Sequence, residues 1–473
     1  MADSTRCIAI VGAGFCGTVT AINLLQQAHG APLRILLIDR ERHGRGTAYA
    51  DHSSYSYLLN VPASRMSAFS SEPLDFLRYA QQALPNVTAD DFLPRILYGQ
   101  YLEEKLSMAE RAAPSHVSLE RVRGTVRSVQ VWRPSHTFIL GFEAGHEMTA
   151  TEVVLALGNP PPAALPGTDQ MREALHLVAD NPWCDSGTNS HDETVLMVGT
   201  GLTMADIVAS TVQIGHRPAR MYAISRHGLV PPRQTAFRHS HSEFDPQPLL
   251  RAASVSMRQL LHLVRQISRD TERRGGDWRE AVTFVRSVAP KLWARLPNSE
   301  RKRFLRHVRA YWDIHRHRLP PSTRAAVDEL RSAHRLIIHA GKILRLEPTG
   351  NQVRVIWKPR GQEQSAMLVV DRVINCTGPD YRCTASRDPL VRDLIANGLI
   401  QPDALGIGVR TAPNGGLVNL FGRATRGLYY VGPMLRADHW EATAVQELRE
   451  YAEHLAHELA HPQVSRALAQ SAS

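Results

Sequence analysis

Short apolar runs rich in β-branched residues recur along the chain, and two of them end directly in glycine-rich segments. Residues 7–11 (CIAIV) precede GAGFCG at 12–17, and residues 194–198 (TVLMV) precede GTGLT at 199–203. Runs of this length and composition predict buried parallel strands. A glycine-rich loop that follows such a strand is typical of a nucleotide-binding βαβ unit. The pattern therefore predicts two nucleotide sites in one chain.

The first glycine-rich loop has the complete dinucleotide fingerprint. Gly12 permits a tight turn, Gly14 lets the backbone approach a pyrophosphate, and Gly17 lets the following helix pack against its strand. Residues 34–38 predict the second strand, and Asp39 at its end is the acid expected to accept ribose hydroxyls. Glycines that only make a turn are the alternative, but the order of strand, loop, helix, strand and acid favours an FAD site.

The second loop is an imperfect copy of the first. Gly199 and Gly201 are present, whereas Met204 stands where the third glycine is expected. The next predicted strand ends at Ser225 and Arg226, where the first unit has an acid. An arginine and a hydroxyl can hold a 2′-phosphate that an acid would repel, so we predict NADPH over NADH. A plain surface arginine is the alternative interpretation.

Three later segments predict that the chain leaves the first domain and returns to it. The strand at 151–157 ends in glycine and three prolines, and the strand at 372–376 ends in Thr-Gly-Pro. Residues 427–433 repeat the design, and a long amphipathic helix is expected to open at Trp440 and to run to about residue 459. The predicted domains are an FAD-binding part at 1–160, an NADPH-binding domain at 161–370 and a return to the FAD domain at 371–473. The expected fold class is α/β, with two Rossmann-like domains and a helical insertion.

The formal net charge of +10 is regional. Residues 251–324 contain 18 Lys and Arg against 6 Asp and Glu, a local excess of +12. The same stretch has helical periodicity, so we expect a helical insertion at about 245–335, with breaks at Gly275-Gly276, Pro290 and Pro297. A solvated arginine-rich helical face is favoured over a nucleic-acid site, and attraction of an anionic substrate or of NADPH phosphates is the intermediate option.

The insertion contains YWDIHRHR at 311–318. His315, Arg316 and His317 could bind a carboxylate or the nicotinamide phosphates, or transfer a proton. Two histidines at i and i+2 point in different directions on a helix, so the segment does not predict a metal site. A structural role for these histidines is an equally good alternative.

Bulk properties are consistent with this picture. At 473 residues the chain is long enough for two or three domains. Its five cysteines have no paired spacing, which predicts neither a structural zinc nor a redox dithiol and fits a reducing compartment. The polar start does not resemble a signal peptide, and no apolar run is long enough to span a bilayer. We therefore expect a soluble cytoplasmic protein.

Further segments support a family resemblance. They are GRGTAYA (44–50), LLNVPASRMSAF (58–69), EPLDFL (72–77), FLPRILYGQYL (92–102), VGTGLTMAD (198–206), SRHGL (225–229), NCTGP (375–379), GP (432–433) and WEATAVQELR (440–449). Together with the two loops and YWDIHRHR they resemble the FAD/NAD(P)-binding protein family over nearly the whole chain. That family is similar in plan to the flavin-dependent monooxygenases that N-hydroxylate amino acids and amines.

The resemblance implies that the cofactors and dioxygen, and not a catalytic side chain, carry out the chemistry. NADPH would reduce FAD, dioxygen would form a C4a-hydroperoxyflavin, and an amine nitrogen would take its distal oxygen. Arg95 and Tyr101 loosely resemble an arginine-containing segment that lines the flavin domain of N-hydroxylases. The Baeyer–Villiger fingerprint FxGxxxHxxxW is missing, since His176 and Trp183 lie seven residues apart without the preceding FxG.

The candidate residues fall into two groups, and no catalytic side chain is assigned. Asn60, Arg95, Gly432 and Thr443 are expected beside the flavin. The full cofactor-binding set is Gly12, Gly14, Phe15, Cys16, Gly17, Asp39, Arg40, Thr47, Asn60, Met66, Arg95, Val126, Gly158, Gly199, Gly201, Leu202, Thr203, Ser225, Arg226, Gly378, Gly432, Pro433 and Thr443. The substrate-side candidates are His315, Arg316, His317, Trp440 and Glu441, although Trp440 and Glu441 could equally cap and anchor the C-terminal helix.

Three functional classes stay open at this point. An NADPH-dependent N-hydroxylating monooxygenase, with FAD and dioxygen, is favoured. An NADPH-dependent reductase or dehydrogenase without oxygen insertion comes second, and a catalytically silent flavin-binding protein comes third. The regional positive charge favours a small carboxylate-bearing amine as substrate, and no nucleic-acid or membrane partner is expected. The substrate's identity and the oligomeric state, including a homo-oligomer, cannot be read from the sequence.

Overall fold

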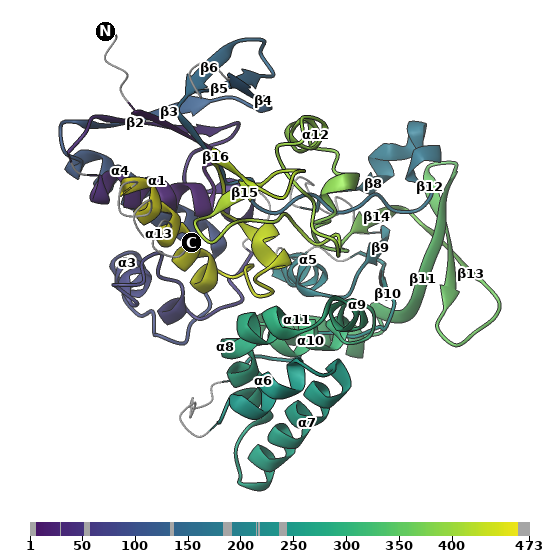
Figure 1. Cartoon of the computed structure of the whole chain (residues 1–473). Helices are drawn as coiled ribbons and strands as arrows, with labels where there is room; N and C mark the ends of the chain where they lie inside the picture. The colour runs from purple at the N-terminus through teal and green to yellow at the C-terminus, as the bar shows by residue number, and fades with distance from the viewer. Residues whose placement is uncertain are drawn as a thin grey trace. The chain divides into compact units, whose positions relative to one another are not determined.

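The computed structural model describes residues 6–28, 30–51, 57–132, 137–182, 192–213, 215, 218–235 and 244–461. The chain forms two compact units (Figure 1). The first unit comprises residues 1–50, 62–160 and 381–473, and the second comprises residues 51–61 and 161–380. The expected α/β class with two nucleotide-type sheets is confirmed.

The first unit is built on a six-stranded sheet in the order β15-β16-β7-β1-β2-β3. All neighbours are parallel except β15 and β16. The strands are β1 (Arg6–Val11), β2 (Leu33–Asp39), β3 (Val117–Arg123), β7 (Glu152–Leu155), β15 (Gly416–Val418) and β16 (Ala424–Tyr430). A second, antiparallel sheet consists of β4 (Val126–Trp132), β5 (Thr137–Phe142) and β6 (Glu147–Ala150). Because β1 is central and buried, the loop at its carboxyl end has a rigid base.

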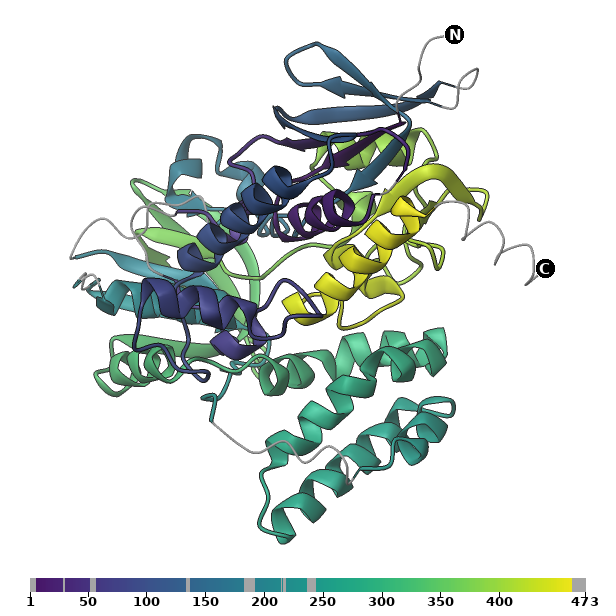
Figure 2. The same cartoon turned by 90° about the vertical axis from the view of Figure 1, so that its left-hand side faces the viewer.

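Helices cover the six-stranded sheet. Figure 2 shows α1, the helix after the first glycine-rich loop, between α4 and α13. The helices of this unit are α1 (Phe15–Gln27), α2 (Gly46–Tyr49), α3 (Asp75–Ala83), α4 (Arg95–Ala112), α12 (Pro389–Ala396) and α13 (Val445–Ala460), with short 3-10 turns at Ala63–Arg65, Cys383–Ala385 and Pro433–Ala437. The C-terminal helix begins at Val445 rather than at Trp440, because the 3-10 turn comes first and Ala444 has an extended backbone.

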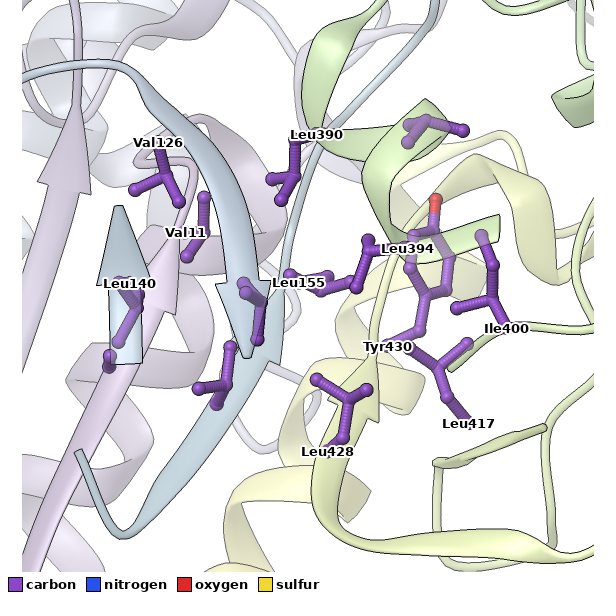
Figure 3. Close-up of a cluster of buried hydrophobic side chains, with 14 of the residues drawn as sticks. Val11, Val126, Leu140, Leu155, Leu390, Leu394, Ile400, Leu417, Leu428 and Tyr430 are labelled. Carbon is purple, nitrogen blue, oxygen red and sulfur yellow. The ribbon is translucent and has the colours of Figure 1, made fainter. Parts of the chain in front are cut away.

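The core of the first unit joins its two sheets and α12. Val11 and Leu155 from the large sheet lie with Leu140 from the small sheet and with Leu390 and Leu394 from α12 (Figure 3). Burial of apolar side chains is the main favourable term in folding. The core therefore ties the segments before residue 160 to those after residue 380, which explains why the chain must return.

The second unit has a seven-stranded sheet in the order β13-β12-β11-β10-β9-β14-β8. The run from β11 to β8 is parallel, and β12 and β13 extend it as an antiparallel hairpin. The strands are β8 (Val178–Ala179), β9 (Thr194–Val198), β10 (Arg220–Ser225), β11 (Leu336–Thr349), β12 (Gln352–Pro359), β13 (Ala366–Val370) and β14 (Arg372–Asn375), and 3-10 turns lie at Thr168–Gln170 and Arg172–Leu177.

Helix α5 (Leu202–Gln213) follows the second glycine-rich loop, and the expected helical insertion follows β10. The insertion comprises α6 (Gln247–Ala253), α7 (Met257–Arg273), α8 (Trp278–Arg295), α9 (Asn298–His307), α10 (Arg309–Arg316) and α11 (Pro321–Ser332), and Figure 1 shows α6, α7 and α8 gathered as one helical group. The expected break at Pro290 is wrong, because α8 continues through it. Ala289, Leu292 and Trp293 are buried around that position, and their burial offsets the cost of an interior proline, about 3 kcal/mol.

Two boundaries differ from the expected domains. The return to the first unit begins at Tyr381 rather than at residue 371, because β14 pairs with β9 and β8 in the second sheet. Residues 51–61 group with the second unit, and Tyr57 and Leu59 within that segment are buried. Among the described residues, no helix has the length and apolar character that crossing a membrane requires. Trp183 and Cys184 lie outside the described residues.

Candidate functional site

At two positions of the first glycine-rich loop there is no room for any residue other than glycine. Gly12 has φ +103°, and a Cβ atom on it would lie 2.3 Å from the carbonyl oxygen of Ala156. A Cβ on Gly17 would lie 1.8 Å from the carbonyl oxygen of Gly12. The Gly12 amide donates to the carbonyl of Ile38, 2.8 Å away, which fixes the loop against β2. The loop therefore has the close helix–strand packing of a dinucleotide site.

Asp39 holds this loop from the end of β2. One carboxylate oxygen accepts the backbone N–H of Ala13 at 2.6 Å, and the other accepts that of Glu41 at 3.0 Å. The carboxylate is thus fixed beside the loop, where an acid is expected to meet a ribose.

Residues 44–46 support the loop from the other side. Gly44 donates its N–H to the carbonyl of Ala13 at 2.9 Å. A Cβ on Gly46 would lie 2.8 Å from the Cα of Gly14, so these two glycines allow a close backbone approach. Arg45 between them is buried and pairs with Glu103 at 2.9 Å, a role that the sequence did not reveal although the residue lies inside the GRGTAYA segment.

The start of α1 fits a phosphate. Gly14 is the N-cap residue, and no side chain caps the helix or adds an acid to its first turn. Amides at such a helix start favour anions. Phe15 stacks on Tyr98 at a centroid distance of 6.3 Å, and Cys16 is buried, which raises the pKa of its thiol to about 12. Cys16 can therefore contribute its backbone but not a thiolate at neutral pH.

The other flavin candidates of the first unit differ in what they offer. Arg40 and Thr47 are exposed, and Arg95 is the first residue of α4. Met66 and Val126 have buried side chains, and Val126 belongs to the hydrophobic core of this unit. Around Gly158 a Cβ would meet no atom within 4 Å, which leaves open space beside the end of β7.

The turn after β16 is tightly packed. Gly432 has φ +150°, and a Cβ on it would lie 2.7 Å from the hydroxyl oxygen of Tyr430. Burial raises the pKa of Tyr430 well above its usual value, and its hydroxyl accepts the N–H of Met434 at 3.1 Å. Pro433 opens the following 3-10 turn. Glycine is therefore required at position 432 for packing, whether or not a flavin is near.

Trp440, Glu441 and Thr443 lie between that turn and α13. The guanidinium of Arg436 sits over the Trp440 ring, 4.4 Å from its centroid, and over the Tyr381 ring at 4.7 Å. Glu441 is only 2% exposed, and its carbonyl accepts the N–H of Thr443 at 2.6 Å. The contact with Arg436 anchors Trp440, which fits the structural alternative to substrate contact.

The second loop repeats the geometry of the first. Gly199 has φ +119°, and a Cβ on it would lie 2.3 Å from the carbonyl oxygen of Cys376. Its N–H donates to the carbonyl of Ile224 at 2.8 Å. Around Gly201, in contrast, a Cβ would meet nothing within 4 Å, and Leu202 and Thr203 then begin α5. On the open side of Gly201, the pyrophosphate of a dinucleotide could approach the protein backbone.

Ser225 connects this loop to the end of β10. Its hydroxyl lies 2.8 Å from that of Thr200 and accepts the N–H of Gly228 at 3.0 Å. Arg226 is exposed beside it. The structure adds two residues that sequence reasoning missed, since His227 and Arg360 are in contact here, with Nη1 of Arg360 2.7 Å from Nδ1 of His227. No local pattern could link residues 133 positions apart.

The remaining candidates belong to the second unit. On α10, Nδ1 of His315 lies 2.7 Å from the carbonyl oxygen of Tyr311, and its ring meets Trp278 edge-on at 5.1 Å. Arg316 contacts His317, which ends the helix. Asn60 and Gly378 are also in this unit, and Gly378 has φ +81° with open space around it.

Comparison with known proteins identifies the first nucleotide region. Residues 9–160 match the family model described as FAD-NAD(P)-binding. The match covers about a third of the chain. The match contains the first glycine-rich loop, Asp39 and the residues 44–46 that support the loop, and it confirms the cofactor class expected from the sequence, FAD with NAD(P).

One curated relative is similar to part of this chain. Nitrosuccinic acid synthase from Aspergillus oryzae is 25% identical over 261 residues. The alignment covers 47% of this chain and 40% of that protein, so the chain spans less than half the length of the relative it matches.

Solved structures share the fold over nearly the whole chain. Ornithine N-hydroxylase from Kutzneria sp. 744, solved with reduced FAD, NADP⁺ and L-ornithine, has a TM-score of 0.61 at 15% identity, and the match covers 97% of this chain and 100% of that chain. Cadaverine monooxygenase from Erwinia amylovora, bound to FAD, has a TM-score of 0.62 at 13% identity, with 97% and 95% covered. Bacillithiol disulfide reductase from Staphylococcus aureus has a TM-score of 0.54 at 12% identity, with 97% and 99% covered. An N-hydroxylase, a monooxygenase and a reductase thus share this fold.

Proposed function

We propose that the protein is an NADPH-dependent flavin monooxygenase that N-hydroxylates an amino acid or amine. The observation that carries the proposal is the pair of unequal glycine-rich loops, each at the carboxyl end of a parallel strand in its own sheet. The first has Asp39 fixed beside it, and the second has Ser225 and Arg226. An acid suits the ribose of FAD, whereas an arginine suits a 2′-phosphate.

The described residues fit the two nucleotides. In the first unit, Gly14 and the uncapped start of α1 would hold the pyrophosphate of FAD. In the second unit, the open side of Gly201 and the first turn of α5 would hold that of NADPH. Bound FAD would supply hydride acceptance and a reaction with dioxygen that no amino-acid side chain provides.

The protein's own residues would bind and orient rather than attack. No described cysteine is suited to nucleophilic catalysis, because burial raises the pKa values of Cys7, Cys16 and Cys376 and Cys383 is buried as well. His315, Arg316 and His317 stay proposals for recognition of the substrate's carboxylate, and Trp440 and Glu441 stay proposals for contact with the substrate. An ornithine N-hydroxylase and a cadaverine monooxygenase have the same fold, which supports an amine substrate.

The second candidate function is an NADPH-dependent reductase without oxygen insertion, which the shared fold of a disulfide reductase favours. One experiment separates the two. The purified protein is loaded with FAD, reduced with NADPH under nitrogen and mixed with oxygenated buffer with and without an amine. A monooxygenase gives a long-lived flavin spectrum distinct from the oxidised and reduced forms, and a hydroxylated product in amounts that match NADPH consumed. A reductase reoxidises at once and releases hydrogen peroxide.

The substrate and the nicotinamide preference have their own measurements. NADPH consumption is screened over amino acids and amines, with hydrogen peroxide measured in parallel to exclude uncoupled turnover. For the cofactor, Arg226→Ala is expected to lower the preference for NADPH over NADH at least about tenfold, since one charge-assisted contact is lost. An unchanged preference in this variant would contradict the assignment of the 2′-phosphate to Arg226.

A further inference from the structure

Three basic side chains gather at the carboxyl end of β10. Ser225, the last residue of β10, pairs with Ala340 on β11, and the carbonyl of Ala340 accepts the backbone N–H of Arg360 at 2.8 Å. This pairing brings the chain after β12 beside the turn that contains Arg226 and His227. The same turn contacts the second glycine-rich loop, because the hydroxyls of Ser225 and Thr200 lie 2.8 Å apart. We name Arg226, His227 and Arg360 the basic cluster.

The geometry of the basic cluster determines the protonation of His227. Nη1 of Arg360 lies 2.7 Å from Nδ1 of His227. A guanidinium has donors and no acceptor, so Nδ1 must be the unprotonated acceptor and the imidazole must be neutral. Among the described residues, the charged and titratable groups that face His227 are Arg226 from its own turn, Arg360 and, from α10, the Tyr311 ring at a centroid distance of 5.5 Å. Burial, then Arg360 and Arg226, lower the pKa of His227, in agreement with the hydrogen bond.

We propose that binding of the 2′-phosphate of NADP(H) to the basic cluster is coupled to protonation of His227, a proposal that rests on the proposed NADPH dependence. The phosphate dianion attracts the guanidinium of Arg360 away from Nδ1. Nδ1 then takes one proton from solvent, and the imidazolium donates to a phosphate oxygen. The anion raises the pKa of His227 where the two arginines had lowered it. Arg360 thereby becomes a second specificity residue beside Arg226.

The coupling has a defined direction with pH. Binding of NADP⁺ takes up protons, so its affinity rises as the pH falls through the pKa of the bound imidazole and levels off below the pKa of the free imidazole. The phosphate itself has a pKa of about 6 and opposes this trend at lower pH. Binding of NAD⁺, which has no 2′-phosphate, depends on neither effect. The phosphate's own titration is the same in the wild type and in a variant without His227. A comparison of these two proteins therefore isolates the contribution of the histidine.

The test is isothermal titration calorimetry of the full-length protein with NADP⁺ and with NAD⁺ at pH 7.5, in buffers of different ionisation enthalpy. The wild type is expected to take up a substantial fraction of one proton with NADP⁺ and none with NAD⁺. His227→Asn keeps an acceptor for Arg360 but cannot be protonated, so it should lose the uptake and bind NADP⁺ about fivefold more weakly at pH 6.5. His262→Asn, an exposed histidine on α7, is the matched control and should behave as the wild type.

The two ways of failing are distinct. Equal proton uptake in the wild type and in His227→Asn, with NADP⁺ still preferred, would overturn the coupling and leave the proposed NADPH site intact. Equal affinity of the wild type for NADP⁺ and NAD⁺ would overturn the 2′-phosphate site and with it the proposed cofactor. Arg360→Gln gives the second readout, because it should weaken NADP⁺ about fivefold and leave NAD⁺ unchanged. An equal loss for both nucleotides would show that Arg360 only stabilises the fold.

Discussion

At the scale of single residues, two glycines of the second loop have different reasons to be glycine. Gly199 has φ +119°, and a Cβ on it would lie 2.3 Å from a backbone oxygen, whereas a Cβ on Gly201 would enter open space. We predict that Gly201→Ala leaves the thermal midpoint unchanged and raises the KM for NADPH about tenfold, because only a bound nucleotide would meet the methyl group.

Gly199→Ala is the matched control for that experiment. It should destabilise the protein by about 3 kcal/mol or more, through backbone strain and the clash with Cys376. Thermal unfolding and NADPH kinetics of both variants give the comparison. An unchanged KM in a stable Gly201→Ala protein would place the nucleotide elsewhere.

At the scale of elements, α8 depends on a local cap. The Asp277 carboxylate accepts the N–H of Arg279 at 2.8 Å, and Glu280 reaches back to the N–H of Asp277 at 3.4 Å. Asp277→Ala should cost about 1 kcal/mol, because helix-start amides lose their acceptor. Asp277→Asn keeps an acceptor oxygen and should lose clearly less. The thermal midpoint, followed by circular dichroism, decides between them, and equal losses would show that the charge rather than the cap matters.

The same scale explains what could be predicted from the sequence. The strands before both glycine-rich loops and the helical insertion follow from local periodicity, so they were predicted correctly. The continuation of α8 through Pro290 was not, because buried neighbours rather than local propensity decide it. The place of β14 in the second sheet and the contact of Arg360 with His227 depend on pairing between distant segments. For the candidate site, the loops could thus be predicted, but the groups that surround them could not.

At the scale of the whole molecule, each unit has its own sheet and its own buried core. The long segment of the second unit, residues 161–380, begins and ends at one place, since Pro162 bridges Pro379 and the N–H of Asp380 donates to the carbonyl of Pro161 at 3.2 Å; residues 51–61 join the unit separately. An inserted unit whose ends lie together can fold around its own core. The two nucleotide sites should therefore be separable by mutation.

Gly17→Ala in the full-length chain tests this separation. Its Cβ would lie 1.8 Å from the carbonyl oxygen of Gly12, so α1 cannot keep its place beside β1 and FAD should be lost. The second unit is expected to keep its affinity for NADP⁺, measured by calorimetry, and a NADP⁺ concentration of 100 times its Kd should still stabilise that unit by about 2.7 kcal/mol. Gly30→Ala is the control that should retain FAD, because this glycine of the same unit has φ +89° and open space around it, so the variant has backbone strain without a clash. Loss of both nucleotides from a folded Gly17→Ala protein would mean that the second site forms only when the first is filled. The two nucleotide sites would then be coupled and not separable.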